Sequence, residues 1–364
     1  MTGGNRNLCM NEKMNVYLSA KLKVLSFVSI VMVLYIHTYY TEGEDMVALG
    51  IMEKLVSRLC VIAVPLFYAI SGYLFFLKMP KGINSIGGKL RKRVRTLLVP
   101  YLIANVLTFL FYVMLNFLIQ VVPSIGAAVN FRILDVVAQG VWPTLRLLFI
   151  DPPVAFQLWF VRDLMLVMLF SPILYAVLRW ISKTNLHWLA LTLLLLSHVF
   201  IGYRMIMAVA WFSVGGLLAI HPKLMITYRA PRIFCYICLV VFVAFIVMNS
   251  FLTLPSSAAR AIPVVGLPTV WLVYDQFTPP HRLAEVNSSW LLQRLCPYTF
   301  FIYLTHEPML NILKKLPMLL SRNEWIFIVS YLCVPLMYVV VACVMGYLLK
   351  RYIPKAYYLY TGGR

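Results

Sequence analysis

The sequence predicts an all-α membrane protein, a polytopic transmembrane helix bundle of about 10 spans with both termini in the cytoplasm. Three observations lead to this prediction. Hydrophobic residues make up 62% of the 364 residues and charged residues 12%, whereas a soluble domain has about 45–50% and about 25%. Apolar runs of about 20 residues, the length that crosses a bilayer, recur along the chain. Lys and Arg outnumber Asp and Glu by 32 to 12, and basic residues concentrate in cytoplasmic loops. A soluble enzyme, a disordered chain and a secreted disulfide scaffold are therefore excluded.

Ten apolar segments are predicted as spans, with a range of eight to eleven. In chain order they cover residues 22–40, 55–76, 96–122, 157–178, 187–203, 205–220, 233–251, 258–275, 295–313 and 325–349. Together they form one membrane domain, 22–350, without internal repeats. Residues 1–21 and 351–364 are predicted as cytoplasmic tails.

The first four spans follow from their flanking segments. No small-residue cleavage site follows the first run, so it is predicted as a retained span rather than a signal peptide. A basic loop precedes the third span. The long outer segment 123–156 precedes the fourth and contains an apolar stretch, 141–150. This segment is either a re-entrant or surface helix covering a site, or a connector.

The later spans carry more interruptions. A hairpin at 202–205 joins the fifth and sixth spans, and Pro263 and Pro268 interrupt the eighth. The seventh contains a CxxC motif, Cys235 and Cys238. Zinc and redox sites need a second CxxC or a nearby His, so these cysteines are interpreted as small membrane-buried side chains, and no metal site is predicted.

The orientation follows from the basic residues. With both termini inside, the cytoplasmic segments hold 22 of the 32 Lys and Arg residues, and seven of them lie between Lys78 and Arg95. The first external loop is instead predicted to hold Glu42, Glu44, Asp45 and Glu53. Lys314 and Lys315 are the main exception to this pattern. A nucleic-acid partner is excluded because no polar stretch is long enough to form a basic soluble face.

A few ionisable residues fall within the predicted spans, where they usually face an internal cavity and indicate function. The six that the predicted topology places toward the outer half of the membrane are His37, Arg58, Arg162, Asp163, His306 and Glu307. We expect them to meet in one cavity. The alternative is that they satisfy one another as packing pairs between helices. A neutral imidazole can take a proton from a hydroxyl, and an arginine can stabilise an oxyanion.

Several short motifs resemble the integral-membrane acyltransferase family 3, whose members O-acylate sugars and other surface polymers. The resemblance covers residues 20–350. It rests on the order and spacing of LYIH at 34–37, VPLFYAISGYL at 64–74, KLRKR at 89–93 with Pro100 and Tyr101, LWFVRDL at 158–164, Gly215 and Gly216, and FIYLTH at 301–306.

One position departs from the family. Members often carry an Arg eleven residues before the first-span His, and here that position is Ser26. Eleven residues are about three helical turns, so Ser26 and His37 face the same way. Lys21 and Lys23 lie nearby, and we expect them on other faces of the helix.

The resemblance implies that the chain is an acyl-CoA-dependent O-acyltransferase, with acetyl-CoA the expected donor. The acceptor would be a hydroxyl of a surface glycan or a lipid-linked saccharide at the outer face of a bacterial cytoplasmic membrane. His37 would act as general base or carry a transient acyl group. The oxyanion would be stabilised by Arg58 or Arg162, helped by Tyr303 or His306.

The resemblance also implies where the donor's phosphates bind. Lys89, Arg91, Lys92 and Arg93 would hold them, since Lys and Arg bind phosphate well. The alternative is that this loop enforces topology and contacts anionic membrane lipids. Two other functions stay open: a transporter or flippase of a lipid-linked saccharide, and a non-catalytic partner in glycan assembly.

Overall fold

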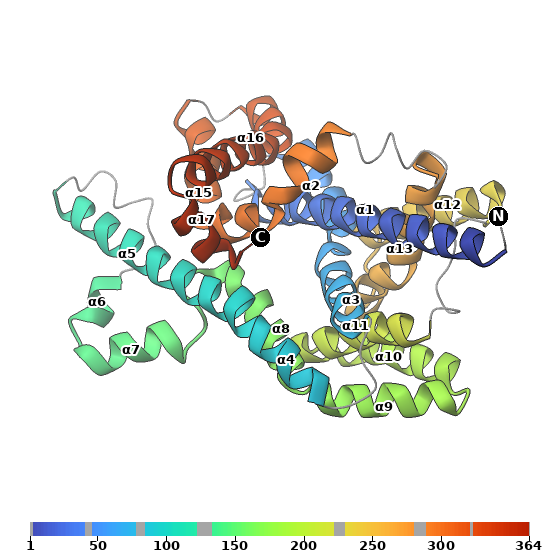
Figure 1. Ribbon diagram of the computed structural model, residues 1–364. Coiled ribbons are helices and arrows are strands. Elements are labelled where there is room, and N and C mark those ends of the chain that lie inside the picture. Colours follow the sequence, from blue (N-terminus) through green and yellow to red (C-terminus); the bar gives the residue numbers. More distant parts are fainter. Residues whose placement is uncertain are drawn as a thin grey trace.

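The computed structural model of the protein describes residues 3–40, 46–77, 84–121, 133–221, 230–279, 289–320 and 323–363, and these ranges are helical apart from short turns (Figure 1). The helices of the first half are α1 (Gly3–His37), α2 (Val47–Cys60), α3 (Ala63–Phe76), α4 (Asn84–Arg93), the π-helical turn η1 (Val94–Leu98), α5 (Val99–Val121), α6 (Ile133–Val137), α7 (Val141–Phe149), the 3₁₀ turn η3 (Phe156–Leu158), α8 (Trp159–Leu169) and α9 (Ser171–Lys183). The second half contains α10 (His187–Ile201), α11 (Arg204–Ile220), α12 (Arg232–Phe251), α13 (Ser256–Phe277), η6 (Leu291–Leu295), η7 (Cys296–Tyr298), α15 (Thr299–Leu320), α16 (Glu324–Tyr352) and α17 (Pro354–Thr361).

The all-α membrane bundle predicted from the sequence is confirmed, and each of the ten predicted segments coincides with a helix or a pair of helices. By length and composition, six helices within the described ranges are long and apolar enough to cross a membrane, and seven if one bent pair counts as a span. That pair is α8 and α9, which meet at 65°. Pro172 stands at the start of α9 and has no N–H to continue α8. Helices α10 and α11 are apolar but shorter.

Helices α3 and α11 form the closest helix crossing at the centre of the bundle. A Cβ atom on Gly72 would lie 2.0 Å from the carbonyl oxygen of Phe212, and one on Gly215 would lie 1.9 Å from that of Ala69. Small residues let membrane helices approach this closely. Helix α1 packs against α3 on one side and α15 on another, which places its C-terminal end beside the second half of the chain.

A buried ion pair near the middle of α1 fixes this helix against α13. Lys21 Nζ lies 2.7 Å from Asp275 Oδ1 and donates to the carbonyl of Trp271 at 2.9 Å. The Tyr17 hydroxyl donates to the same Asp275 oxygen at 2.5 Å. Buried charges persist when they are paired in this way. The end of the predicted tail 1–21 is therefore packed against α13.

The C-terminal segment also packs against the bundle. Helix α17 folds back from α16 onto α5 and α15, with Tyr357 and Thr361 buried. The hydroxyl of Tyr360 donates to the carbonyl of Leu304 at 3.2 Å. Within the described residues, the predicted tail 351–364 thus forms part of the helix bundle.

The segment between α5 and α8 folds back beside α5 (Figure 1). Asn105 holds it from both directions: its amide donates to the carbonyl of Leu148 at 2.7 Å, and its side-chain oxygen accepts from the amide of Ala155 at 3.1 Å. These hydrogen bonds lie near the start of α5, so the segment packs against this helix as well as connecting two spans. Residues 122–132 of it lie outside the described ranges.

Candidate active site

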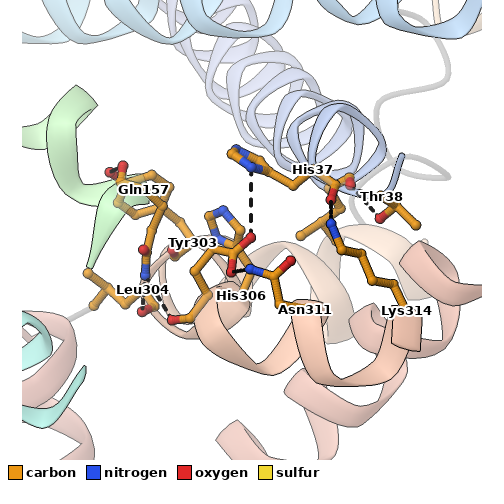
Figure 2. Close-up of polar contacts among 10 residues, drawn as sticks. His37, Thr38, Gln157, Tyr303, Leu304, His306, Asn311 and Lys314 are labelled. Carbon is orange, nitrogen blue, oxygen red and sulfur yellow. Dashed lines mark hydrogen bonds and ion pairs between the residues drawn. The ribbon is translucent and has the colours of Figure 1, made fainter. Parts of the chain in front are cut away.

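Three of the predicted residues meet where the end of α1 crosses α15 (Figure 2). The Nδ1 atom of His37 lies 3.8 Å from Glu307 Oε1. The His37 ring lies 5.3 Å from the ring of His306, centroid to centroid, and 6.2 Å from the ring of Phe156. His306 is fully buried and Glu307 is 8% exposed, while 19% of the surface of the His37 side chain is exposed. His37 is therefore the member of this cluster that a substrate can reach.

A proline in α15 shapes the cluster. Glu307 has φ −108° and ψ 130°, an extended conformation within the helix, because a residue before proline is disfavoured in the α region. Pro308 also lacks the N–H that the carbonyl of Leu304 would accept in a regular helix. The side-chain amide of Gln157 supplies that hydrogen bond at 3.2 Å and donates to the carbonyl of Glu307 at 3.1 Å.

His306 has a defined tautomer in its neutral form. Its Nδ1 atom lies 2.8 Å from the carbonyl oxygen of Tyr303, and a carbonyl only accepts, so Nδ1 carries the proton. The Nε2 atom is buried and has no hydrogen-bond partner among the described residues. Neutral His306 thus presents an acceptor rather than a donor, which suits proton transfer better than stabilisation of an oxyanion.

Two residues that the sequence analysis did not assign to the site complete it. The amide of Asn311 donates to Glu307 Oε2, and Lys314 Nζ donates to the carbonyl of His37 at 3.3 Å while lying 4.5 Å from the centroid of the Tyr39 ring. A cation stabilises the carbonyls at a helix C-terminus. This contact explains why Lys314 is basic although it lies outside the predicted cytoplasmic segments. Positions 311 and 314 follow Glu307 by one and two helical turns, and this spacing could have identified them.

Tyr303 lies beside His306, 5.9 Å away between ring centroids. Its hydroxyl donates to the backbone carbonyl of Gln157 at 2.6 Å. That hydrogen bond joins α15 to η3, so the hydroxyl is already used within the fold. Tyr303 therefore packs beside His306 with its hydroxyl and its carbonyl both hydrogen-bonded.

Arg162 and Asp163 lie in a second cluster. Buried Asp163 pairs with Arg204 at 2.9 Å (Oδ2 to Nε) and with Arg162 at 3.5 Å (Oδ1 to Nε). The guanidinium of Arg204 also lies 4.9 Å from the centroid of the Trp159 ring. Arg204 belongs to the predicted hairpin 202–205, so its role in this cluster was missed because the hairpin was interpreted only as a turn.

Arg58 lies elsewhere. It lines a cavity of about 650 Å³ together with Lys54 and the connection between α12 and α13. The expectation of one cavity shared by six groups therefore needs correction: three lie together, two form a neighbouring pair, and Arg58 faces another cavity. The physical reason is that depth within a span can be estimated from sequence, whereas the direction of a side chain around its helix depends on the packing.

A cavity of about 710 Å³ lies beside the His37 cluster: Tyr303 lines it, whereas His37, His306 and Glu307 are not among its lining residues. Its walls come from α1, α3, η1, α8 and α15. The lining residues include the aromatic side chains of Phe160 and Tyr303 and the cations Lys23 and Arg93. Two cations and no carboxylate occur among the described residues that line it.

The four predicted phosphate-binding residues differ in placement. Arg93 lines this cavity, and Arg91 and Lys92 are exposed. Lys89 instead donates to the carbonyls of Phe75 and Leu77, at 2.6 and 3.0 Å, and so caps the end of α3. Lys78 and Lys81 lie outside the described residues.

The prediction that Lys23 lies on a different face of the first helix from Ser26 was wrong. Lys23 and Ser26 line the same cavity because positions three apart are neighbours on one face of a helix. Lys21, by contrast, is committed to Asp275.

A second cavity reaches Glu307 from the opposite face of α15. It holds about 430 Å³ and lies between α5, α15, α16 and α17. Its wall is almost entirely apolar, with Glu307, Thr108, Thr305 and Tyr360 as the polar lining residues. The His37 cluster therefore lies between a cavity with basic residues and an apolar one.

Comparison with known proteins gives one match. The pattern of the family described as "Acyltransferase domain", Acyl_transf_3, matches residues 20–349, nearly the whole chain. No curated protein and no solved structure matches this chain.

Proposed function

Because the chain belongs to the acyltransferase 3 family of membrane enzymes, we propose that it transfers an acetyl group from cytoplasmic acetyl-CoA to a hydroxyl of a glycan or glycolipid at the outer face of the membrane. The observation that carries this proposal is the position of His37, a partly accessible imidazole beside a buried carboxylate. That pairing suits general-base catalysis.

The 710 Å³ cavity supports an acyl-CoA donor. Its volume falls within the range of about 300–1,000 Å³ that is usual for cofactor sites. Arg93 suits phosphate, and the apolar walls suit the pantetheine arm. Tyr303 lines the cavity, and its ring lies 5.9 Å from the ring of His306, centroid to centroid. A donor lying along it would direct its thioester toward His37.

The reaction then needs one base. The acceptor hydroxyl gives its proton to His37 Nε2, and its oxygen attacks the thioester carbonyl. The tetrahedral intermediate breaks the carbon–sulfur bond, and the leaving thiolate takes the proton back from the imidazolium. Glu307, at 3.8 Å from Nδ1, stabilises that imidazolium, since a carboxylate in a poorly solvated site interacts strongly with a cation.

The apolar cavity favours an acceptor that carries a lipid chain. A free glycan needs many hydrogen-bond partners, and burying its hydroxyls without them is costly. The wall between α5 and α16 offers few such partners. A glycolipid would place its chain there and its hydroxyl at the Glu307 end, next to His37.

The test uses purified full-length protein with radiolabelled acetyl-CoA. Glucose and octyl glucoside serve as probe acceptors, and both thioester turnover and labelled product are measured. We expect transfer that is greater for octyl glucoside, and a fall of at least about 10²-fold in His37→Ala because a general base contributes 10²–10⁴-fold. His187→Ala is the matched control, since His187 contacts His221 rather than the cluster. Turnover by His37→Ala at the wild-type rate would refute the assignment.

A further inference from the structure

Lys23 is a cation for which the fold gives no structural use. Among the described residues, it has no ion pair, and its side chain is exposed on the wall of the 710 Å³ cavity. Two basic neighbours are occupied instead: Lys21 pairs with Asp275, and Lys89 caps α3. Burying a lysine head group beside carbonyls or a carboxylate stabilises a fold, but an exposed one beside a cavity does not.

The positive charge of Lys23 lies beside a second cation in the same cavity. Lys23 comes from α1 and Arg93 from the end of α4, so the two cations reach one cavity from different elements. No carboxylate among the described lining residues offsets them. A largely apolar cavity lined by two uncompensated cations suits a molecule with an anionic head and a less polar arm.

Ser26 determines where an anion can bind along α1. It lines the cavity one turn beyond Lys23 and is half-buried, whereas Lys23 is exposed. A small hydroxyl there leaves the interior open and supplies no charge. The backbone of Lys23 is displaced about 4.5 Å along the helix axis from position 26, toward the N-terminus of α1, because a helix rises 1.5 Å per residue.

From these observations we infer that Lys23 binds a phosphate group of the acyl-CoA donor, together with Arg93, and is the cation that α1 contributes to the 710 Å³ cavity. The inference rests on the proposed function, because it needs a phosphorylated donor. Lys23 is a binding residue, far from the reacting atoms. Its loss would weaken donor binding and leave the chemical step intact.

The experiment measures binding of coenzyme A, 3′-dephospho-coenzyme A and pantetheine to the purified full-length protein by calorimetry. Transfer kinetics with acetyl-CoA are measured in parallel. For Lys23→Gln we expect coenzyme A affinity to fall about tenfold, the usual effect of losing one charge-assisted hydrogen bond. We expect KM for acetyl-CoA to rise similarly, kcat to stay unchanged, and pantetheine binding to be unaffected.

Three further variants sharpen the test. Lys23→Arg is expected to keep the affinity. The double variant Lys23→Gln/Ser26→Arg is expected to regain part of it, since both positions line the cavity. Lys183→Gln removes the same charge from an exposed site at the end of α9 and is expected to bind like the wild type.

The outcomes separate the two proposals. Wild-type protein that binds coenzyme A while Lys23→Gln binds it equally well would overturn the role of Lys23 and leave the proposed function standing. Equal losses in Lys23→Gln and Lys183→Gln would also overturn it, by showing a general charge effect. Wild-type protein that neither binds coenzyme A nor turns over acetyl-CoA would instead refute the proposed function.

Discussion

At the scale of single residues, the site depends on a carboxylate that a proline puts in place. Glu307 departs from helical geometry because Pro308 follows it, and its two oxygens then face different partners, His37 and Asn311. The same proline leaves the carbonyl of Leu304 to accept from Gln157 and Tyr360. The catalytic geometry and the local hydrogen bonding thus share one cause.

Glu307→Gln tests the carboxylate directly. The amide keeps the shape of the side chain but cannot neutralise an imidazolium, so we expect kcat to fall by about 10²-fold with KM for acetyl-CoA unchanged. The measurement is steady-state transfer kinetics. Asp151→Asn, the same change in a surface pair with Arg146, is the control. Unaltered kcat in Glu307→Gln would show that His37 works without the carboxylate.

The buried pair of Lys21 and Asp275 predicts an effect on stability rather than on chemistry. Lys21→Met leaves Asp275 as a buried charge whose main cation is gone, a change that costs about 3–5 kcal/mol. We expect a clear fall in the thermal unfolding midpoint of the detergent-solubilised protein. Lys21→Met/Asp275→Leu should recover much of it, because both charges are then absent. A double variant no more stable than Lys21→Met would contradict this interpretation.

At the scale of elements, the crossing of α3 and α11 positions the donor cavity. Phe67, Ile70 and Ser71 of α3 line it, so the packing of α3 against α11 determines where this wall of the cavity stands. Gly72 and Gly215 permit a backbone contact that no larger residue allows. The sequence motif containing Gly215 and Gly216 thus has a packing explanation.

Gly215→Leu is expected to prevent this packing, because even its Cβ would lie 1.9 Å from the carbonyl oxygen of Ala69. We expect loss of the monodisperse peak in size-exclusion chromatography of the solubilised protein. Gly88→Ala is the matched control, since nothing lies within 4 Å of a Cβ at that position. A well-folded Gly215→Leu protein would mean that the two helices can separate without harm.

At the scale of the whole molecule, the charge pattern predicts which way the bundle crosses the membrane. The end of the donor cavity that carries Arg93 lies next to the basic helix α4, and the His37 cluster lies at the opposite end of α1. The predicted orientation, with both termini in the cytoplasm, puts Arg93 on the cytoplasmic side and His37 toward the outer face, as the proposed use of a cytoplasmic donor requires.

Labelling of single cysteines tests this orientation. In a variant without native cysteines, Lys92→Cys should react with a membrane-impermeant thiol reagent only after the cells are opened. Trp142→Cys, on exposed helix α7, should react in intact cells. The expectation follows from the concentration of Lys and Arg in cytoplasmic loops. Reaction of Lys92→Cys in intact cells would reverse the predicted topology.

The sequence by itself determined that the protein is a helical membrane bundle and where its ten apolar segments lie. It also predicted that six ionisable groups, among them His37, His306 and Glu307, share one region. These follow from composition, run length and the order of charges, which are properties of the linear chain. The family motifs added the acyltransferase assignment, which the match over residues 20–349 establishes.

Only the tertiary structure decided which ionisable groups meet. It placed Arg58 at a separate cavity, paired Arg162 and Arg204 with Asp163, and added Asn311 and Lys314 to the site. It also separated Lys21, which is buried against Asp275, from Lys23, which faces the donor cavity. The physical reason is that sequence position fixes the depth of a residue along its helix, whereas its partners depend on how each helix is rotated and bent against the others.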